Sequence, residues 1–293
     1  MFKISKEIFI SDFHRLYNEN GLTSEVISLF QKMIYYYYKN HKREFPFREN
    51  ITPYTVLISE IMLQQTQTER VSEKYLQFIN KFPDFSSLHA ASIEEVLKEW
   101  KGLGYNRRAI ALKRIAESVV KDYEGKLPDS IGILKSFPQI GHNTASSIIT
   151  FAFNKPTAFI ETNIRRVYIY FFFPNKSKIN DKEIMSIVKN TIDIHDPREW
   201  YYALMDYGVM LKKTHPELNK RSIHYRKQVP FKGSNREIRG KILELLIKQG
   251  KMKIKNIQRV FDGKEQYKIM NILNQLKKEG FIEMTTDTIN LKE

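Results

Sequence analysis

Apolar residues recur at helical spacing through most of the chain. In the stretch 24–40, for example, Val26, Phe30 and Ile34 fall on one side of a helix. Helical spacing returns in the stretches 53–81, 109–122, 136–166 and 179–211. Residues 1–23 alternate only weakly and end at the turn signal Asn20–Gly21, so we expect them to form an N-terminal extension. The pattern predicts a mainly α protein.

The last sixty residues carry a different pattern. Ser234 and Glu237 form a predicted capping box before a helix over 238–248. The pattern continues with two predicted helices and two alternating strands, at 254–261, 265–278, 281–285 and 288–291. Three helices and a β-hairpin are typical of a winged-helix domain. We therefore expect four parts: an extension (1–23), a helical region of two lobes (24–211), a basic linker (212–233) and a small α+β domain (234–293).

Composition narrows the class of partner. The 293 residues include 48 Lys and Arg against 33 Asp and Glu, a formal net charge of +15. This balance favours a polyanionic partner, with nucleic acid ahead of an anionic membrane. No cysteine occurs, which excludes disulfides, thiol catalysis, iron–sulfur clusters and cysteine-based zinc sites. The apolar runs are too short for a membrane span, and we expect a soluble, cytoplasmic protein.

The segment 136–166 reads as two helices joined by a tight turn, followed by an acid that opens a third helix. Pro138 and Gly141 bracket the turn, because proline cannot continue a helix and glycine tolerates left-handed backbone. The free N–H groups of the following helix suit a phosphate. Glu161 follows an apolar run that would bring it inward, and its helix start and the nearby Arg165 and Arg166 favour its charged form. The alternative is an ordinary ion pair between Glu161 and Arg165.

A second carboxylate lies in a different environment. Glu60 belongs to the almost wholly apolar run Val56–Leu63, which Pro53 opens as a helix. Burial disfavours the ionised form, so we expect a raised pKa for Glu60 and a role as general acid. The alternative is an ion pair with a nearby Arg or Lys. Two carboxylates with pKa values pushed apart could combine acid chemistry with stabilisation of positive charge.

Four motifs, within roughly residues 30–211, resemble the MutY-type adenine DNA glycosylases of the helix-hairpin-helix, or endonuclease III, superfamily. They are SEIMLQQTQ (Ser59–Gln67), KGLGYNRRA (Lys101–Ala109), the hairpin FPQIGHN (Phe137–Asn143) and FIETNIRRV (Phe159–Val167). The resemblance implies the helix-hairpin-helix glycosylase fold and excision of a base flipped out of double-stranded DNA.

The resemblance also implies roles for individual residues. Glu60 would protonate the base, Glu161 would stabilise the sugar cation, and Asn143 is the third catalytic candidate. Gln65 would enter the base stack, and Tyr105 would act as a second wedge beside phosphate contacts from Arg107 and Arg108. The DNA-binding candidates are Gln64, Gln65, Tyr105, Arg107, Gly141, His142, Thr144, Asn163 and Arg166.

The sequence departs from the family at several of these positions. Asn143 stands where the bifunctional enzymes carry a lysine, and an amide cannot form the imine needed for strand cleavage. Gln139 replaces a glycine of the hairpin, which costs about 1–2 kcal/mol if the backbone is left-handed there. Glu161 replaces an aspartate. Lys212 stands where the first cysteine of the family's iron–sulfur cluster would be, and the winged-helix pattern is not the Nudix-like C-terminal domain of MutY enzymes.

These observations predict a monofunctional DNA glycosylase of base excision repair without lyase activity, a cofactor or a metal. It would act as a monomer on double-stranded DNA holding a mismatched or damaged base, most simply adenine opposite guanine or 8-oxoguanine, with no membrane partner. In a prokaryote it would associate with the nucleoid. Two alternatives remain: a thymine or uracil mismatch glycosylase, and a catalytically silent DNA-binding protein.

Overall fold

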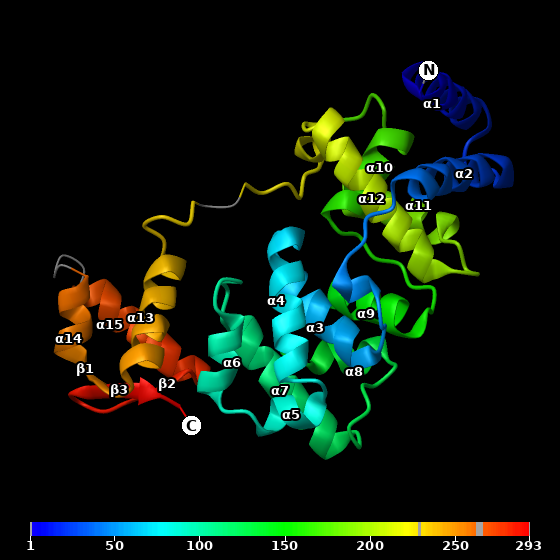
Figure 1. The fold of residues 1–293 in the computed structure, drawn as a ribbon. Helices are drawn as coiled ribbons and strands as arrows, with labels where there is room; N and C mark the ends of the chain where they lie inside the picture. Colours follow the sequence, from blue (N-terminus) through cyan, green and yellow to red (C-terminus); the bar gives the residue numbers. More distant parts are fainter. Residues whose placement is uncertain (1, 228–229, 262–265, 293) are drawn as a thin grey trace. The chain divides into compact units, whose positions relative to one another are not determined.

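The computed structural model describes residues 2–227, 230–261 and 266–292, and the chain divides into two compact units. The first unit comprises Met1–Ile51, Asp129–Lys135 and Ile140–Lys227. The second comprises Thr52–Pro128, Ser136–Gln139 and Gln228–Glu293. The chain passes between the units several times, so neither is a continuous stretch of sequence (Figure 1).

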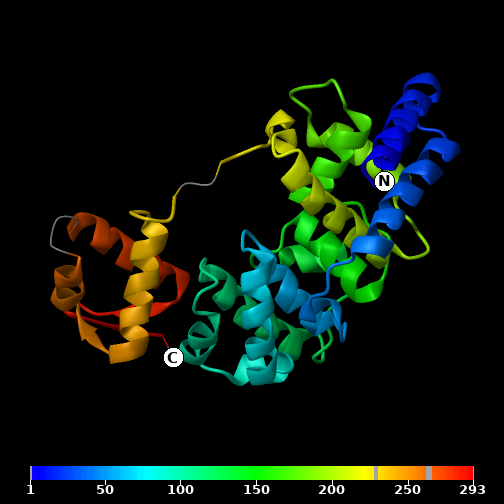
Figure 2. The ribbon, with the colours of Figure 1, turned by 45° about the horizontal axis from the view of Figure 1, so that its top comes forward.

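Helices build the first unit. They are α1 (Phe2–Asn20), α2 (Ser24–His41), the 3-10 turn η1 (Pro46–Arg48), α8 (Ile131–Ser136), α9 (His142–Phe153), α10 (Thr162–Phe172), α11 (Asp181–Thr191), α12 (Pro197–Thr214) and the 3-10 turn η2 (Leu218–Arg221). The apolar helix α10 is the centre of this unit and packs against α12, α11 and α1 (Figure 1, Figure 2). The helical pattern predicted over 179–211 is confirmed as α11 and α12.

The N-terminal segment is part of this core, which corrects the expectation of an extension over residues 1–23. Phe13 of α1 is fully buried, and its ring lies 5.2 Å from that of Phe171 and 6.2 Å from that of Phe30, centroid to centroid. Aromatic packing of this kind stabilises a helix whose own apolar pattern is weak.

The second unit combines a helical lobe with the C-terminal domain. The lobe holds α3 (Pro53–Leu63), α4 (Thr68–Lys81), α5 (Phe85–Ala90), α6 (Ile93–Trp100) and α7 (Arg107–Asp122). The C-terminal domain holds α13 (Asn235–Gln249), β1 (Met252–Lys253), α14 (Ile254–Val260), α15 (Gln266–Glu279), β2 (Ile282–Met284) and β3 (Thr288–Leu291). Trp100 and Phe78 are fully buried in the lobe.

The C-terminal domain has the predicted helices and hairpin. The strands pair antiparallel in the order β1-β3-β2, with Met252 opposite Ile289 and Met284 opposite Ile289 on the other side (Figure 2). The sequence pattern did not reveal β1, because two residues show no alternation. Ser234 caps α13 as predicted, but the Glu237 carboxylate accepts from the N–H of Gly233 instead of closing a capping box. The predicted start of the third helix, Glu265, lies outside the described residues.

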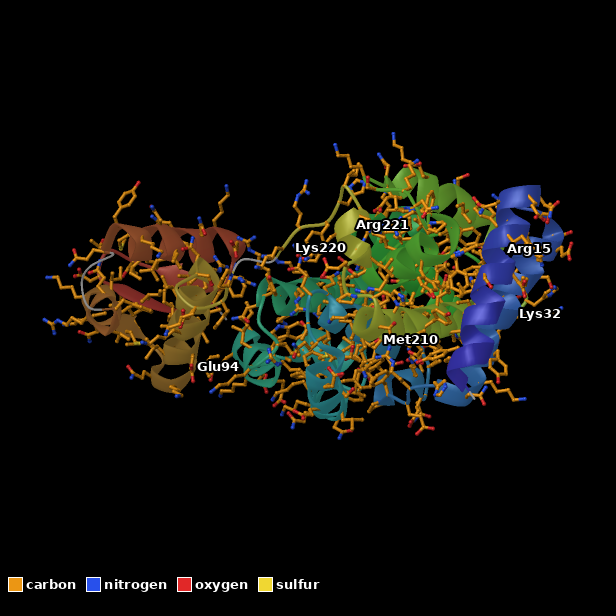
Figure 3. All side chains as sticks on the ribbon, turned by 90° about the horizontal axis from the view of Figure 1, so that it is seen from above. Arg15, Lys32, Glu94, Met210, Lys220 and Arg221 are labelled. Atoms are coloured by element: carbon orange, nitrogen blue, oxygen red, sulfur yellow. The ribbon has the colours of Figure 1, made fainter. Side chains whose placement is uncertain are left out.

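The linker predicted over 212–233 is partly folded. Helix α12 continues to Thr214, and η2 packs against α10, with Lys220 and Arg221 on this turn (Figure 3). Leu218 is buried, and Asn219 donates from Nδ2 to the Thr162 carbonyl at 3.2 Å. Residues 228–229 of the predicted linker lie outside the described residues. Across the described residues, no helix combines the length and apolar character needed to cross a membrane.

Candidate active site

Glu60 lies on α3, whose position follows from a strong local start signal. Thr52 and Thr55 form a capping box, and Pro53 occupies the first turn. The helix is buried through Val56–Ser59 and again at Ile61 and Met62, whereas Glu60 is half-buried. The buried setting of the run is as predicted, and the raised pKa of Glu60 stays a prediction.

The helix ends in the turn that carries the two glutamines. Gln65 is exposed and has a left-handed backbone with φ 54°. Gln64 is half-buried and donates from Nε2 to the Gln139 carbonyl at 3.1 Å. The side chain of Gln64 therefore joins this turn to the hairpin turn, whereas Gln65 presents its side chain to solvent, as a residue entering a base stack requires.

Arg108 joins the glutamine turn to a second turn. It is buried and donates to the carbonyls of Ile61, Met62 and Gln64 at 2.9, 2.8 and 2.6 Å. It also donates to the carbonyls of Leu103 and Gly104, both at 3.0 Å. Burial lowers the pKa of Arg108 to about 10, so the side chain stays charged near neutral pH. The expectation that Arg108 contacts phosphate is wrong. Its guanidinium is buried and donates to backbone carbonyls inside the protein.

Tyr105 stands at the tip of the second turn. Gly102 and Gly104 have φ of 97° and 70°, as the predicted tight turn requires, and Tyr105 itself has φ 47°. Tyr105 is half-buried, and Arg107 is exposed at the start of α7. The Arg107 guanidinium pairs with Glu279 of α15 while its side chain remains 56% exposed.

The hairpin forms as predicted despite the missing glycine. Gln139 adopts φ 63°, and α9 begins at His142 with Gly141 as its N-cap. Gly141, His142 and Asn143 are exposed. The helix start therefore presents backbone N–H groups to solvent, where a phosphate can reach them.

Asn143 and Thr144 follow in the first turn of α9. Asn143 donates from Nδ2 to the Ile160 carbonyl at 2.8 Å, which places its amide one residue from Glu161. Thr144 is half-buried. The hydrogen bond from Asn143 connects the hairpin helix to the strand-like segment that leads into α10.

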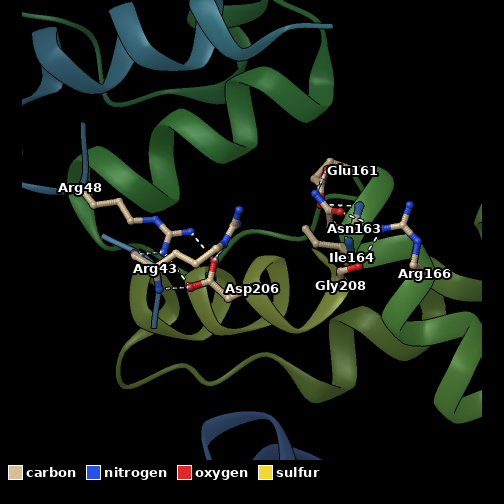
Figure 4. Close-up of polar contacts among 8 residues, drawn as sticks. All are labelled: Arg43, Arg48, Glu161, Asn163, Ile164, Arg166, Asp206 and Gly208. Atoms are coloured by element: carbon tan, nitrogen blue, oxygen red, sulfur yellow. Dashed lines mark hydrogen bonds and ion pairs between the residues drawn. The ribbon is translucent and has the colours of Figure 1, made fainter. Parts of the chain in front are cut away.

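Glu161 is the N-cap of α10, as its place in the sequence predicts. Its Oε1 accepts from the N–H groups of Asn163 and Ile164 at 2.6 and 2.8 Å (Figure 4). Burial raises the pKa of Glu161, and the opposing effects of these hydrogen bonds and of Arg166 and Arg165 do not cancel it. The helix end and the cations act in the predicted direction, but desolvation outweighs them and the net shift of the Glu161 pKa is upward.

The alternative pairing of Glu161 with Arg165 is also wrong. Arg165 donates from Nε and NH2 to the two carboxylate oxygens of Asp181, at 2.8 and 2.6 Å. This bidentate pair turns the guanidinium of Arg165 toward α11.

Arg166 and Asn163 form a chain of hydrogen bonds that ends on the Glu161 carboxylate. Arg166 is buried and donates from NH1 to Asn163 Oδ1 and to the Gly208 carbonyl, both at 2.8 Å (Figure 4). Asn163 in turn donates from Nδ2 to Glu161 Oε2 at 3.3 Å. Because Arg166 is buried, it is not placed to make the direct DNA contact expected of it. It instead positions the side chain of Asn163. Asn163 is half-buried.

Sequence reasoning missed Gly208 and Asp206 of α12. A Cβ on Gly208 would lie 2.5 Å from the Asn163 carbonyl oxygen, so only glycine fits there. Asp206 is buried and accepts from the guanidinium groups of Arg43 and Arg48 at 2.8 and 2.9 Å (Figure 4). A glycine and an acid inside the apolar run 200–211 were the signals available, since both are unfavourable in a buried helix without a local reason.

The region after α12 does not fit an iron–sulfur cluster. Such a cluster needs four thiolates, and the sequence has none. Lys212 is exposed in the last turn of α12, and the following residues form η2. Arg221 of this turn donates to the Phe173 and Lys176 carbonyls and so holds it against the end of α10.

The structure thus assembles the predicted residues in two groups, one in each unit. In the second unit, Arg108 unites the turns bearing Gln64, Gln65 and Tyr105 next to the helix of Glu60. In the first unit, Asn143, Glu161 and Asn163 meet at the starts of α9 and α10.

Comparisons with known proteins agree with this arrangement. The sequence model of the HhH-GPD superfamily of base excision DNA repair proteins matches residues 58–192, which hold both carboxylates. An adenine DNA glycosylase of Buchnera aphidicola subsp. Acyrthosiphon pisum (strain APS) is 32% identical over 184 residues, 62% of this chain and 53% of that protein. The thymine/uracil-DNA glycosylase of Methanothermobacter thermautotrophicus is 27% identical over 192 residues, 64% of this chain and 87% of that protein. The structure of a thermostable thymine-DNA glycosylase superposes with a TM-score of 0.56 at 26% identity, over 63% of this chain and 86% of that chain.

The helical fold and the hairpin define a protein of the helix-hairpin-helix class. Residues 58–192 match the HhH-GPD superfamily model, and the chain is similar to adenine DNA glycosylases of Buchnera and Mycobacterium. It spans about half the length of the adenine glycosylases of Buchnera that it matches.

Proposed function

We propose that this protein is a monofunctional DNA glycosylase that hydrolyses the N-glycosidic bond of a mispaired adenine. One observation carries the proposal: the segment Ser59–Gln67 places Glu60 on a buried helix and Gln65 on an exposed turn directly after it. Similarity to adenine DNA glycosylases supports adenine as the target. The partner is double-stranded DNA with adenine opposite guanine or 8-oxoguanine.

In the proposed reaction, Glu60 transfers its proton to N7 of the flipped adenine. The C–N bond to the sugar breaks, its electron pair leaves with the base, and positive charge develops on the sugar. The Glu161 carboxylate stabilises that charge, and water adds to the sugar to give an abasic site and a proton. A half-buried carboxylate whose charge is poorly solvated interacts more strongly with a cation that appears during the reaction than an exposed one does.

Strand cleavage is not part of the proposed activity. Asn143 offers an amide in place of the lysine that forms the imine in bifunctional enzymes. Its Nδ2 is committed to the Ile160 carbonyl. We also propose a monomer that works without an iron–sulfur cluster, so the purified protein should contain no stoichiometric iron by elemental analysis.

A thymine or uracil mismatch glycosylase is the second candidate. Residues of this chain cover 87% of the thymine/uracil-DNA glycosylase of Methanothermobacter, a larger share than of the adenine enzymes. The two candidates differ in the base that is released, so one excision experiment distinguishes them.

The test is single-turnover excision on a duplex panel, followed by alkali to reveal abasic sites. The panel holds adenine opposite 8-oxoguanine, guanine and cytosine, and thymine or uracil opposite guanine. We expect adenine release, and we expect Glu60→Gln to lower its rate by about 10²–10⁴-fold with DNA binding retained. Glu94→Gln is the matched control, since Glu94 is a half-buried glutamate on α6 that pairs with Lys98 outside the candidate site (Figure 3).

Each outcome decides between the candidates. Release of thymine or uracil instead of adenine assigns the mismatch activity. Tight binding to every duplex with no release from any of them identifies a silent DNA-binding protein. Full activity in Glu60→Gln removes Glu60 from the acid role.

A further inference from the structure

The C-terminal domain is joined to the helical lobe of its unit by a compact group of charged contacts. Glu279, the last residue of α15, accepts from Arg107 of α7 through its carboxylate. Its backbone carbonyl accepts from Arg114, also of α7, at 2.8 Å. Lys101 pairs with Glu244 of α13 at 2.8 Å. The contacts therefore involve two different helices of the C-terminal domain, which fixes its orientation on the lobe.

The chemistry at Glu279 favours this contact. Burial alone would raise the pKa of Glu279, but hydrogen bonds from Arg107 and Arg239 outweigh it and lower that pKa. Arg107 and Arg114 also lie at the C-terminal end of α15, where the helix dipole attracts cations. The Glu279 carboxylate is thus shared by Arg107 and Arg239, while Arg114 binds its backbone carbonyl, so the contact keeps an excess of positive charge.

Arg236 extends this contact to the tip of the Tyr105 turn. It lies one turn before Arg239 on α13, donates from NH1 to the Tyr105 hydroxyl, and stands 5.1 Å from the Tyr105 ring centroid. Tyr105 is a DNA-binding candidate of the proposed glycosylase. In a complex in which Tyr105 contacts DNA, the positive charge of Arg236 would therefore lie close to the phosphates beside that turn.

We propose that the C-terminal domain is a docked part of the DNA interface, and that Arg236 provides a phosphate contact next to Tyr105. This inference rests on the proposed function, because that function places Tyr105 against DNA. Arg107 can join the same surface while paired with Glu279, since more than half of its side chain is exposed. The ligand is the sugar–phosphate backbone of duplex DNA, read without regard to sequence.

The first test asks whether the docked arrangement binds DNA. Because the chain has no cysteine, Lys101→Cys with Glu244→Cys introduces two unique thiols that a short bismaleimide can join. We expect cross-linking with and without duplex DNA, and an unchanged dissociation constant for an undamaged fluorescent duplex after cross-linking. Loss of affinity by about tenfold or more would mean that the domain must leave for DNA to bind, and would overturn the proposal.

The second test isolates Arg236. We expect Arg236→Ala to weaken duplex binding about three- to tenfold at low salt and to reduce the slope of log K against log salt by about 0.9, as for one lost phosphate contact. Arg236→Lys should retain the slope. The matched control is Lys255→Ala on α14, a helix that packs on β1 of the same domain. Equal effects of Arg236→Ala and Lys255→Ala would refute the assignment.

Two readouts keep the outcomes separate. Cross-linking of the 101–244 thiol pair in the Arg236→Ala background shows whether the domain is still docked, so that a binding loss reports the missing contact. Duplex binding does not depend on excision. A protein that binds duplex DNA as expected but releases no base would refute the proposed glycosylase activity and would still support the proposed DNA interface.

Discussion

Glu161 illustrates a conflict between stability and chemistry within one residue. Its Oε1 caps α10, which stabilises the helix, but burial raises its pKa and so disfavours the charged form. A group with a raised pKa in the folded protein makes its full contribution to stability below its unfolded pKa. That contribution is lost as the pH rises through the folded pKa.

We therefore predict that Glu161→Gln stabilises the protein at neutral pH while abolishing excision. The Gln oxygen can still accept from the N–H groups of Asn163 and Ile164, and only the weaker 3.3 Å bond from Asn163 Nδ2 is lost. The difference in melting temperature between Glu161→Gln and the wild type should be absent near pH 4 and should increase as the pH rises. Over the same range, the wild-type excision rate should climb as Glu161 ionises. A melting temperature below wild type at every pH would contradict this account.

Arg108 shows the opposite case, a charged residue used wholly for structure. We predict that Arg108→Ala lowers the free energy of unfolding by at least about 3 kcal/mol, because several buried carbonyls lose their donor together. Its neighbour Arg107 is the control. Arg107→Ala removes a half-exposed ion pair and should cost about 1 kcal/mol or less. Urea unfolding measures both, and similar losses for the two variants would rule out the special position of Arg108.

At the scale of elements, the closeness of α10 and α12 holds the carboxylate in place. Gly208 of α12 lies directly against the backbone of Asn163, and its carbonyl accepts from Arg166. The start of α10 therefore has no room to move closer to α12, and the hydrogen bond from Arg166 to the Gly208 carbonyl holds it there. Any added atom at Gly208 must move the residues that hold Glu161.

We predict that Gly208→Ala destabilises the protein by about 1–3 kcal/mol and lowers the excision rate, because the new methyl group cannot be accommodated by a flexible side chain. Gly240→Ala is the matched control. Gly240 lies inside α13 with open space around its Cβ position, so alanine there should add up to about 1 kcal/mol of stability. Thermal unfolding and single-turnover kinetics check the pair. Equal stability changes would show that the contact with Asn163 is unimportant.

The whole molecule carries its positive charge on helices and turns of both units. With a formal net charge of +15, we predict that duplex affinity falls steeply with salt, by about 10³-fold or more between 50 and 200 mM if six or more phosphates are contacted. Fluorescence anisotropy across a salt series measures this. A nearly flat response would count against a DNA interface of the proposed size.

Local signals made much of this molecule predictable from the sequence. Pro53 fixed the start of α3, Pro138 and Gly141 marked the hairpin, and the N-cap position of Glu161 followed from its neighbours. These features depend on residues close together in the chain, and sequence patterns report such neighbours well.

Features set by distant residues were not predictable. Phe13 is buried because of Phe30 and Phe171, and nothing within residues 1–23 reveals those partners. Arginines are mostly exposed, so the interior role of Arg108 could not be read from its position. The pKa of Glu161 depended on the balance between desolvation and charge, which only the packed structure determines.

The hydrogen bonds of Arg108 also constrain how this protein can change over time. One guanidinium holds the turn before Gln65 and the turn before Tyr105, so the two tips form a single rigid piece. Substitutions at Gln65 and Tyr105 should then be epistatic, with coupling energies of about 0.5–3 kcal/mol. A lineage that adapts to a different lesion would have to alter both tips together or first replace the arginine that links them.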